Sequence, residues 1–240
     1  MRIAVLSDIH ANLPALEAVL AALGPVDAVW QLGDAIGYGP QPNEVVERLR
    51  GLDAVGVQGN HEAAALGRMD LAWFNDDARA AIEWTAPRLT AESRDWLAAL
   101  PDRRVERGVT LVHGSPRDPL REYVLSPAIA RASLAAATTP HVLFGHTHDP
   151  RLFREVDGRV ESLVPAAGAT LALDERPALA NPGSVGQPRD GDPRASVLEL
   201  DTENGGLRWL RIAYPIATTQ ARMREAGLPR RLIDRLDLGL

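Results

Sequence analysis

Histidine is scarce in this sequence, and most of its copies stand beside other residues that bind metal ions. Five of the six histidines lie in short polar segments that follow apolar runs. In chain order the metal-binding segments are Asp8-Ile9-His10, Gly33-Asp34, Gly59-Asn60-His61-Glu62, His113-Gly114 and Gly145-His146-Thr147-His148. Imidazole, carboxylate and amide oxygen are donors that divalent transition metals accept. The segments are therefore candidate pieces of a metal centre.

Each segment alone has an ordinary explanation. Asp-x-His after a strand is commonly a turn and a helix cap, Gly-Asp is a common turn dipeptide, and a lone His113 is typical of a protein core. Gly145-His146-Thr147-His148 is the most specific, because two imidazoles on one glycine-containing loop can converge on a metal. Its alternative is a polar loop.

All five segments together favour a site with two metals. Two divalent ions about 3.5–4 Å apart need a bridging carboxylate and several terminal donors. The sequence offers seven candidates, which are Asp8, His10, Asp34, Asn60, His113, His146 and His148.

The spacing of apolar residues predicts the elements that carry these segments. In the first half we expect strands at residues 2–7, 26–32, 54–57, 109–112 and 141–144, with helices at 13–23, 42–50, 78–84, 92–100 and 127–137. Their β-α-β order predicts neighbouring parallel strands. Each polar segment follows such a strand, which is where α/β folds place their sites.

The second half has an antiparallel character. Residues 151–156 and 159–164 flank Asp157-Gly158, which favours a hairpin with a type I′ turn, and residues 196–200 and 207–212 predict another hairpin. We therefore expect an α/β fold, a four-layer αββα sandwich of two mixed sheets flanked by helices. One domain over residues 1–240 is expected, with a helical cap-like insertion at about 61–100 and a helical tail at about 218–240.

Composition narrows the class of protein. The chain has no cysteine, no signal-peptide pattern and no apolar stretch long enough for a spanning helix, so we expect a cytoplasmic protein that does not engage a membrane. The net charge of −6 disfavours a nucleic-acid polymer as partner. Self-assembly into a homo-oligomer is left open.

The five segments resemble the calcineurin-like metallophosphoesterase superfamily, whose pattern is D-x-H, G-D, G-N-H-[DE], H and G-H-x-H. All five blocks occur in this order between Asp8 and His148. Asn181-Pro182-Gly183-Ser184 further resembles the compact prokaryotic branch of predicted phosphodiesterases. The sandwich expected above is also the fold that this resemblance implies.

The resemblance implies a role for each residue. Asp8, His10 and His148 would hold one metal, Asn60, His113 and His146 the other, and Asp34 would bridge them. A hydroxide between the ions would attack phosphorus in line. His61 would be catalytic rather than a ligand, stabilising the transition state or protonating the leaving oxygen. The metals are expected to be Mn²⁺, with Fe, Zn²⁺, Co²⁺ and Ni²⁺ as alternatives.

Further residues near the motifs have two interpretations each. Tyr38 would line the substrate pocket or belong to a rigid turn with its ring exposed. Arg117 would bind a substrate phosphate or pair with Asp118 or Glu122. Glu62 would orient His61 or interact with the helix dipole. Asn12 and Asn181 are expected to shape loops near the site.

We expect a hydrolase of small phosphate esters, with a nucleotide-like phosphodiester favoured. The alternatives are a phosphomonoesterase, a dinucleoside polyphosphate hydrolase, a polynucleotide nuclease and a catalytically silent scaffold that binds protein partners. The acidic net charge disfavours the nuclease, and the intact motif disfavours the scaffold.

Overall fold

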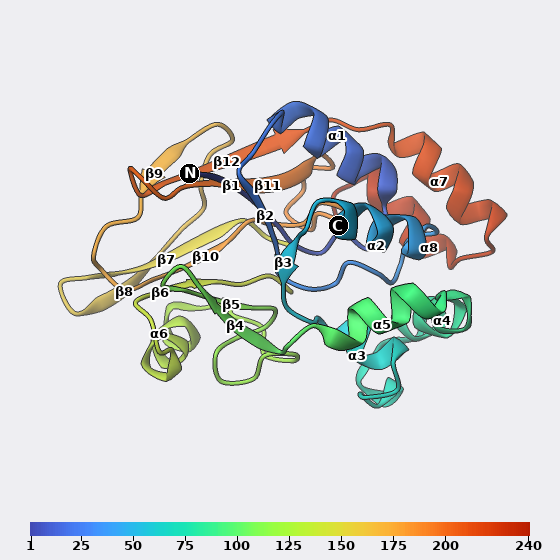
Figure 1. The fold of residues 1–240 in the computed structure, drawn as a ribbon, viewed down its shortest axis with the longest axis horizontal. Helices are drawn as coiled ribbons and strands as arrows, with labels where there is room; N and C mark the ends of the chain where they lie inside the picture. Colours follow the sequence, from blue (N-terminus) through green and yellow to red (C-terminus); the bar gives the residue numbers. More distant parts are fainter.

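Two six-stranded β-sheets face each other in the computed structural model, which describes residues 1–240 (Figure 1). The first sheet has the order β3-β2-β1-β11-β12-β9. Its strands are β1 (Arg2–Leu6), β2 (Ala28–Gln31), β3 (Val55–Gly56), β9 (Thr170–Ala172), β11 (Ala195–Asp201) and β12 (Gly206–Ile212). β1, β2 and β3 are parallel, whereas β11 and β12 run antiparallel to their neighbours. This sheet is therefore mixed.

The second sheet has the order β4-β5-β6-β10-β7-β8 and is also mixed. Its strands are β4 (Arg103–Glu106), β5 (Val109–Val112), β6 (His141–Leu143), β7 (Arg151–Val156), β8 (Arg159–Leu163) and β10 (Ala178–Asn181). β5, β6 and β10 are parallel. Both halves of the chain contribute to each sheet, because one predicted hairpin joins the first sheet as β11–β12 and the other joins the second as β7–β8.

The central strands are apolar on both faces, since each sheet is covered on both sides. In β1, Ile3 and Val5 point into a core shared with the second sheet, whereas Ala4 and Leu6 point toward helices. The period of two along a strand explains this division. Trp30 and Trp209 fill the space between the sheets, and both are 2% exposed or less.

Helices cover the outer faces and complete four layers. Helices α1 (Leu13–Leu23) and α2 (Pro42–Gly51) pack on the first sheet, and α6 (Pro127–Ala136) packs on the second. Asn12 caps α1 by accepting a hydrogen bond from the Ala15 amide, and proline occupies the first turn. None of the helices is long and apolar enough to cross a membrane. The predicted fold class is thus confirmed.

The remaining helices lie at the end of the sandwich where the site residues gather. Beyond β3 the chain forms α3 (Asn60–Ala65), the short 3₁₀ helices η1 (Leu71–Trp73) and η2 (Ala86–Arg88), α4 (Asp76–Thr85) and α5 (Ala91–Ala99). The tail forms α7 (Ile216–Glu225), α8 (Arg230–Asp234) and η3 (Arg235–Asp237). Apolar side chains of α4 and α8 pack around Tyr38, so the tail lies beside the centre of the motif region.

Three strands were not predicted. β4 has the sequence RRVE and is largely exposed, and β9 is a three-residue edge strand, so neither has the alternation that indicates a strand. β10 has the sequence ALAN without β-branched residues, although it lies buried between β6 and β7. Its strand conformation is imposed by its neighbours rather than by its own propensity.

Candidate metal centre

The seven predicted metal ligands lie together at one end of the sandwich. Six of them stand on the loops that follow β1, β2, β5 and β6, and Asn60 begins α3 after β3. All seven are at most 7% exposed. Buried charges and imidazoles need partners, so a cluster of this density indicates a shared function.

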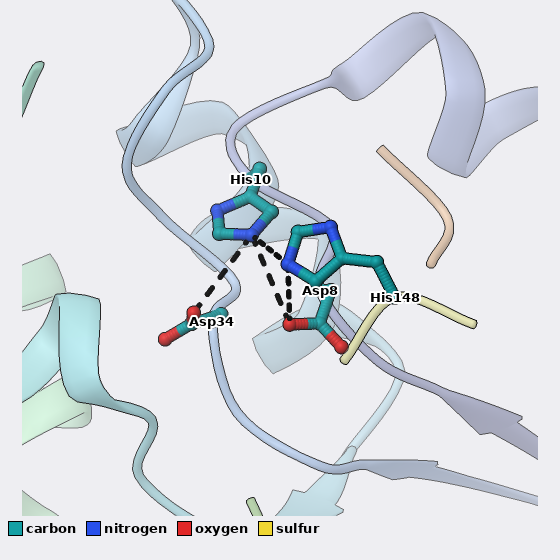
Figure 2. A group of neighbouring side chains, drawn as sticks. All are labelled: Asp8, His10, Asp34 and His148. Carbon is teal, nitrogen blue, oxygen red and sulfur yellow. Dashed lines mark hydrogen bonds and ion pairs between the residues drawn. The ribbon is translucent and has the colours of Figure 1, made fainter. Parts of the chain in front are cut away.

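One cluster joins Asp8, His10 and His148 (Figure 2). The Nε2 atoms of His10 and His148 are 3.1 Å apart. The Oδ1 atom of Asp8 lies 3.1 Å from the His148 Nε2 and 3.8 Å from the His10 Nε2. Three donor atoms therefore converge on one point.

Hydrogen bonds on the far side of each ring fix the tautomers in this cluster. The Nδ1 of His10 lies 3.1 Å from the Ile36 carbonyl oxygen, and that of His148 lies 2.6 Å from the Gln187 carbonyl oxygen. A carbonyl only accepts, so each Nδ1 carries the hydrogen and each neutral ring has a lone pair on Nε2. The two lone pairs face each other, which a cation between them would stabilise.

A second cluster joins Asn60, His113 and His146. The Nδ1 of His113 donates to the Leu32 carbonyl oxygen at 2.8 Å. Its Nε2 lies 2.9 Å from the Asn60 Oδ1 and 3.0 Å from the His146 Nδ1. The donor set again consists of nitrogen and oxygen atoms directed at one point.

Asp34 stands between the two clusters. Its Oδ2 lies 3.8 Å from the His10 Nε2 and 3.3 Å from the His113 Nε2, and its Oδ1 accepts a hydrogen bond from the His61 amide. Burial alone would raise the pKa of Asp34, but His113 and His61 hold that pKa well below its usual range. The carboxylate is therefore ionised and placed to serve both clusters.

The separations fit ligands around divalent cations. Metal bonds of about 2.0–2.2 Å place neighbouring ligand atoms roughly 3 Å apart. The Asp8 Oδ1 is buried without a hydrogen-bond partner. An orphaned buried carboxylate oxygen is costly unless a cation completes it, and nitrogen and oxygen donors suit several transition metals. The residues present thus fit two metal ions.

Burial keeps most of these imidazoles neutral, which is the form that binds metal. Burial lowers the pKa of His61 to about 4 and that of His146 to about 3. His113 differs, because although burial opposes its charge, the Asp34 carboxylate raises its pKa to about 9. Metal binding near neutral pH would therefore displace a proton from His113.

The backbone at the centre is strained. Ten residues other than glycine have a positive φ, and six of them are predicted site residues, which are Asp8, His10, Asp34, Tyr38, His146 and His148. Left-handed backbone costs energy for residues with a Cβ and concentrates at functional sites. The surrounding contacts must therefore hold these loops in place.

Two glycines of the motifs lie so close to neighbouring side chains that no other residue fits at these positions. A Cβ on Gly59 would lie 2.2 Å from the Asp34 Oδ1, and one on Gly145 would lie 2.0 Å from the Ser7 Oγ. Both contacts are too short for real atoms, so any side chain there would displace a ligand or its support.

Residues behind the ligands hold the loops. The Asn181 Nδ2 donates to the Gly145 carbonyl oxygen and the Thr147 Oγ1, which positions the loop carrying His146 and His148. The Asn12 Nδ2 donates to the Gly186 carbonyl oxygen beside that region. The prediction that both asparagines shape loops is confirmed.

Glu62 does not touch the His61 ring. Its carboxylate accepts hydrogen bonds from the amides of Gly59, Asp34 and Ile36. Through the Gly59 amide it caps the first turn of α3, and through the Asp34 and Ile36 amides it ties this helix to the loop after β2. The orienting role expected for Glu62 is therefore exerted on Asp34 rather than on His61.

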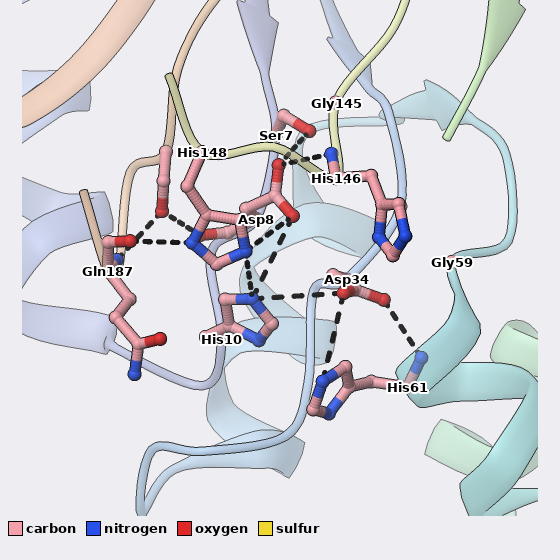
Figure 3. A network of polar contacts seen from close by, with 12 residues as sticks. Ser7, Asp8, His10, Asp34, Gly59, His61, Gly145, His146, His148 and Gln187 are labelled. Atoms are coloured by element: carbon pink, nitrogen blue, oxygen red, sulfur yellow. Dashed lines mark hydrogen bonds and ion pairs between the residues drawn. The ribbon is translucent and has the colours of Figure 1, made fainter. Parts of the chain in front are cut away.

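His61 lies beside Asp34, on the side away from Asp8 (Figure 3). The His61 Nε2 is 4.0 Å from the Asp34 Oδ2, and its Nδ1 has no hydrogen-bond partner. The rings of Tyr38, His10 and His61 contact one another, with centroid distances of 4.4 Å from Tyr38 to each histidine and 4.9 Å between the two histidines. Tyr38 lines the pocket over the centre and is only 7% exposed, so it is not the exposed turn residue of the alternative interpretation.

Arg117 does not line that pocket. Its Nη2 lies 3.2 Å from the Glu122 Oε1, which is the surface ion pair of the alternative interpretation. The loop after β5 instead turns Arg121 and Tyr123 toward the pocket, and Tyr123 stacks on His146 at 3.8 Å. Arg117 and these two residues share one loop, and the direction in which each side chain points depends on tertiary packing.

Arg189 is a pocket residue that sequence reasoning missed. Its Nη2 lies 3.3 Å from the Tyr38 Oη and 3.1 Å from the Gln187 Oε1. It follows Asn181-Pro182-Gly183-Ser184 by five residues, and this proximity to a recognised motif was the available signal.

Residues 1–205 match the calcineurin-like phosphoesterase superfamily domain. The chain belongs to this family. A crystal structure of a metallophosphoesterase from Sphaerobacter thermophilus is 46% identical, with a TM-score of 0.92 over 100% of this chain and 99% of that one. The family assignment and this relative make the protein a phosphoester hydrolase.

Two further relatives extend over the whole length. An uncharacterized protein of Methanocaldococcus jannaschii is 34% identical over 244 residues, covering 99% of this chain and 98% of that protein. A hypothetical protein from Pyrococcus horikoshii OT3 has a TM-score of 0.78 at 22% identity, over 100% of this chain and 98% of that one. The latter likeness shows the fold alone. The calcineurin-like phosphoesterase assignment thus agrees with the sandwich architecture and with the candidate metal cluster.

Proposed function

We propose that this calcineurin-like phosphoesterase hydrolyses small phosphate esters at two metal ions, with a nucleotide-like phosphodiester as the favoured substrate. The observation that carries the proposal is the pair of donor clusters joined by Asp34. One site would be Asp8, His10 and His148, the other Asn60, His113 and His146, with Asp34 bridging. Mn²⁺ is the metal that we test first, followed by Fe, Zn²⁺, Co²⁺ and Ni²⁺.

When bound, divalent cations supply positive charge for phosphate oxygens and a water of lowered pKa. The chain supplies the arrangement. Hydrogen bonds from Nδ1 to carbonyl oxygens keep the rings of His10, His113 and His148 oriented before any substrate arrives. Because the rings are already oriented, no free energy is needed to reorient them during the reaction.

His61 would act on the leaving oxygen. Its ring is buried against Tyr38 and Phe74, with its Nδ1 free of partners. With a pKa of about 4, His61 is neutral near pH 7. It would therefore contribute a neutral N–H hydrogen bond to the leaving oxygen rather than an acidic proton.

The rim of the pocket supports a substrate with an aromatic group. Trp73 is 64% exposed and Tyr123 is 44% exposed, and both line the pocket. Exposed aromatic rings stack on a nucleobase, and they discriminate little between bases. A phosphomonoester and a dinucleoside polyphosphate remain the alternatives, since the same donors serve each.

The test combines metal analysis with substrate comparison. Chelator-treated protein is reloaded with each metal, its metal content is measured, and hydrolysis of bis(p-nitrophenyl) phosphate is compared with that of p-nitrophenyl phosphate. We expect two metal equivalents and a higher kcat/KM for the diester, followed by activity on cyclic and dinucleotide substrates. A preference for the monoester would favour the phosphatase alternative, and absence of all hydrolysis with two metals bound would overturn the proposal.

A further inference from the structure

A second cleft of about 620 Å³ opens beside the metal pocket. The two cavities share Tyr38, Asn75, Tyr123 and Arg189, so they lie next to each other. The outer wall of the second cleft comes from the tail, through Arg231 of α8 and Arg235 of η3. The packing of α8 against α4 and Tyr38 fixes this wall.

Three arginines face this cleft without an Asp or Glu carboxylate in ion-pair distance. Arg189, Arg231 and Arg235 form none of the protein's salt bridges, whereas Arg230, one residue away in α8, pairs with Asp234 at 3.1 Å. The Arg235 Nε donates to an oxygen of Leu240, the last residue of the sequence, and Arg189 is held through Tyr38 and Gln187. Arg189 and Arg231 thus face the cleft without an anionic partner, in a chain of net charge −6.

The arginines are close enough for the positive charge of one to disfavour the charged form of another. Partial burial, followed by the charges of Arg189 and Arg231, lowers the pKa of Arg235 to about 10. Two aspartates also line the cleft, but Asp76 is engaged with Arg79. Asp77 is the one carboxylate left to face three guanidinium groups, so the cleft has an excess of positive charge.

We propose that this arginine cleft, defined by Arg189, Arg231 and Arg235, binds a second phosphate group of the substrate. The inference rests on the proposed function, because it places the scissile phosphate at the metal centre. Arg189 lines both cavities and would contact the phosphates between them, while Arg231 and Arg235 would hold the distal one. The substrate class is then an oligophosphate, such as a nucleoside polyphosphate whose base stacks on the aromatic rim.

The kinetic test uses the double variant Arg231→Gln/Arg235→Gln and the matched control Arg230→Gln. For each protein loaded with metal, kcat/KM is measured for ATP and for bis(p-nitrophenyl) phosphate. We expect kcat/KM for ATP, divided by kcat/KM for the diester, to fall about tenfold or more in the double variant. The reason is that charged hydrogen bonds to the distal phosphate of ATP are lost. Arg230 lies outside both cavities, so its variant should keep the ratio. An unchanged ratio in the double variant would overturn the inference.

A binding test without metal separates this inference from the proposed function. Calorimetry on chelator-treated protein measures binding of inorganic tripolyphosphate, which the metal centre does not hold without cations. We expect wild type and Arg230→Gln to bind, and Arg231→Gln/Arg235→Gln to bind at least about tenfold more weakly. Equal binding by the double variant with an intact circular dichroism spectrum would contradict the arginine cleft. If only the double variant loses tripolyphosphate binding, but metal-loaded wild type hydrolyses no phosphate ester, the proposed function alone would be contradicted.

Discussion

Three histidine rings at the metal centre owe their orientation to backbone carbonyls rather than to acidic side chains. In His10, His113 and His148, the Nδ1 donates a hydrogen bond to a carbonyl oxygen and the Nε2 points into the donor cluster. A hydrogen bond from the nitrogen on the far side of the ring fixes both the tautomer and the direction of the ring. The donor atoms are thus set by the chain before a metal binds.

Asp34 is the residue on which both clusters depend. We expect Asp34→Asn to weaken binding at both metal positions and to lower kcat by at least about a hundredfold, because the amide removes a shared negative charge. Metal content and turnover are measured together, with Asp192→Asn as the control, since that carboxylate pairs with Arg194 outside the centre. Two full metal equivalents and near wild-type turnover in Asp34→Asn would remove the bridging assignment.

Metal content should distinguish a His61 variant from a variant that has lost a metal ligand. We expect His61→Ala to retain both metals and to lose about 10²–10³ in kcat, because only a hydrogen bond to the reacting group is removed. His141→Ala serves as the control, since His141 binds the Asp174 carbonyl oxygen at the start of β6. If His61→Ala bound less metal than the control, His61 would join the ligand set.

At the level of elements, the loop after β6 depends on β10. Asn181 ends β10, is fully buried, and its side chain makes three hydrogen bonds that hold Gly145, Thr147 and Gly183. Because His146 and His148 belong to different metal clusters, a shift of this one loop would disturb both. The strand that sequence patterns did not predict is therefore the support of the most specific motif.

We expect Asn181→Ala to lower metal affinity about 10–100-fold without removing any ligand, as loss of outer-shell support does in metal sites. Affinity is measured by titrating chelator-treated protein with Mn²⁺. Asn204→Ala is the control, because Asn204 contacts only the exposed Asp201 carboxylate through its side chain. Equal affinities in the two variants would show that the loop holds its conformation without Asn181.

The elements that sequence could predict were those with strong local signals. Helical spacing predicted α1 and α2, and the dipeptide Asp157-Gly158 predicted the turn between β7 and β8, where both residues have a positive φ. The residues of the two donor clusters followed from motif order. Arg189 and Tyr123 could not be predicted, because they approach the pocket through loops whose direction depends on packing between distant elements. The same dependence misplaced Arg117.

Considered as a whole, the molecule builds each metal cluster across the boundary between its two sheets. Asp8 and His10 follow a strand of the first sheet, while His148 follows one of the second. Asn60 follows β3 of the first sheet, and His113 and His146 follow β5 and β6 of the second. Metal bound at either cluster would join the two sheets, so metal binding is coupled to the stability of the entire sandwich.

This coupling predicts how stability depends on pH with and without metal. In the metal-free protein, the raised pKa of His113, about 9, contributes stability below pH 6.5 that is lost as pH rises through 9. The lowered pKa values of His61 and His146, about 4 and about 3, contribute stability above pH 6.5 that is lost as pH falls. The three histidines together therefore favour a maximum in melting temperature near pH 6.5.

Metal should change the dependence of melting temperature on pH mainly on the alkaline side. A cation takes the place of the His113 proton, so its affinity rises over the window in which that proton leaves, between pH 6.5 and about 9. We expect melting temperatures measured from about pH 5 to about pH 9 to decline on the alkaline side with chelator, and to lose that decline with excess Mn²⁺. On the acid side, protonation of the ligands competes with metal, so the two curves should converge. A decline on the alkaline side that persists in Mn²⁺ would show that His113 does not exchange its proton for a metal ion.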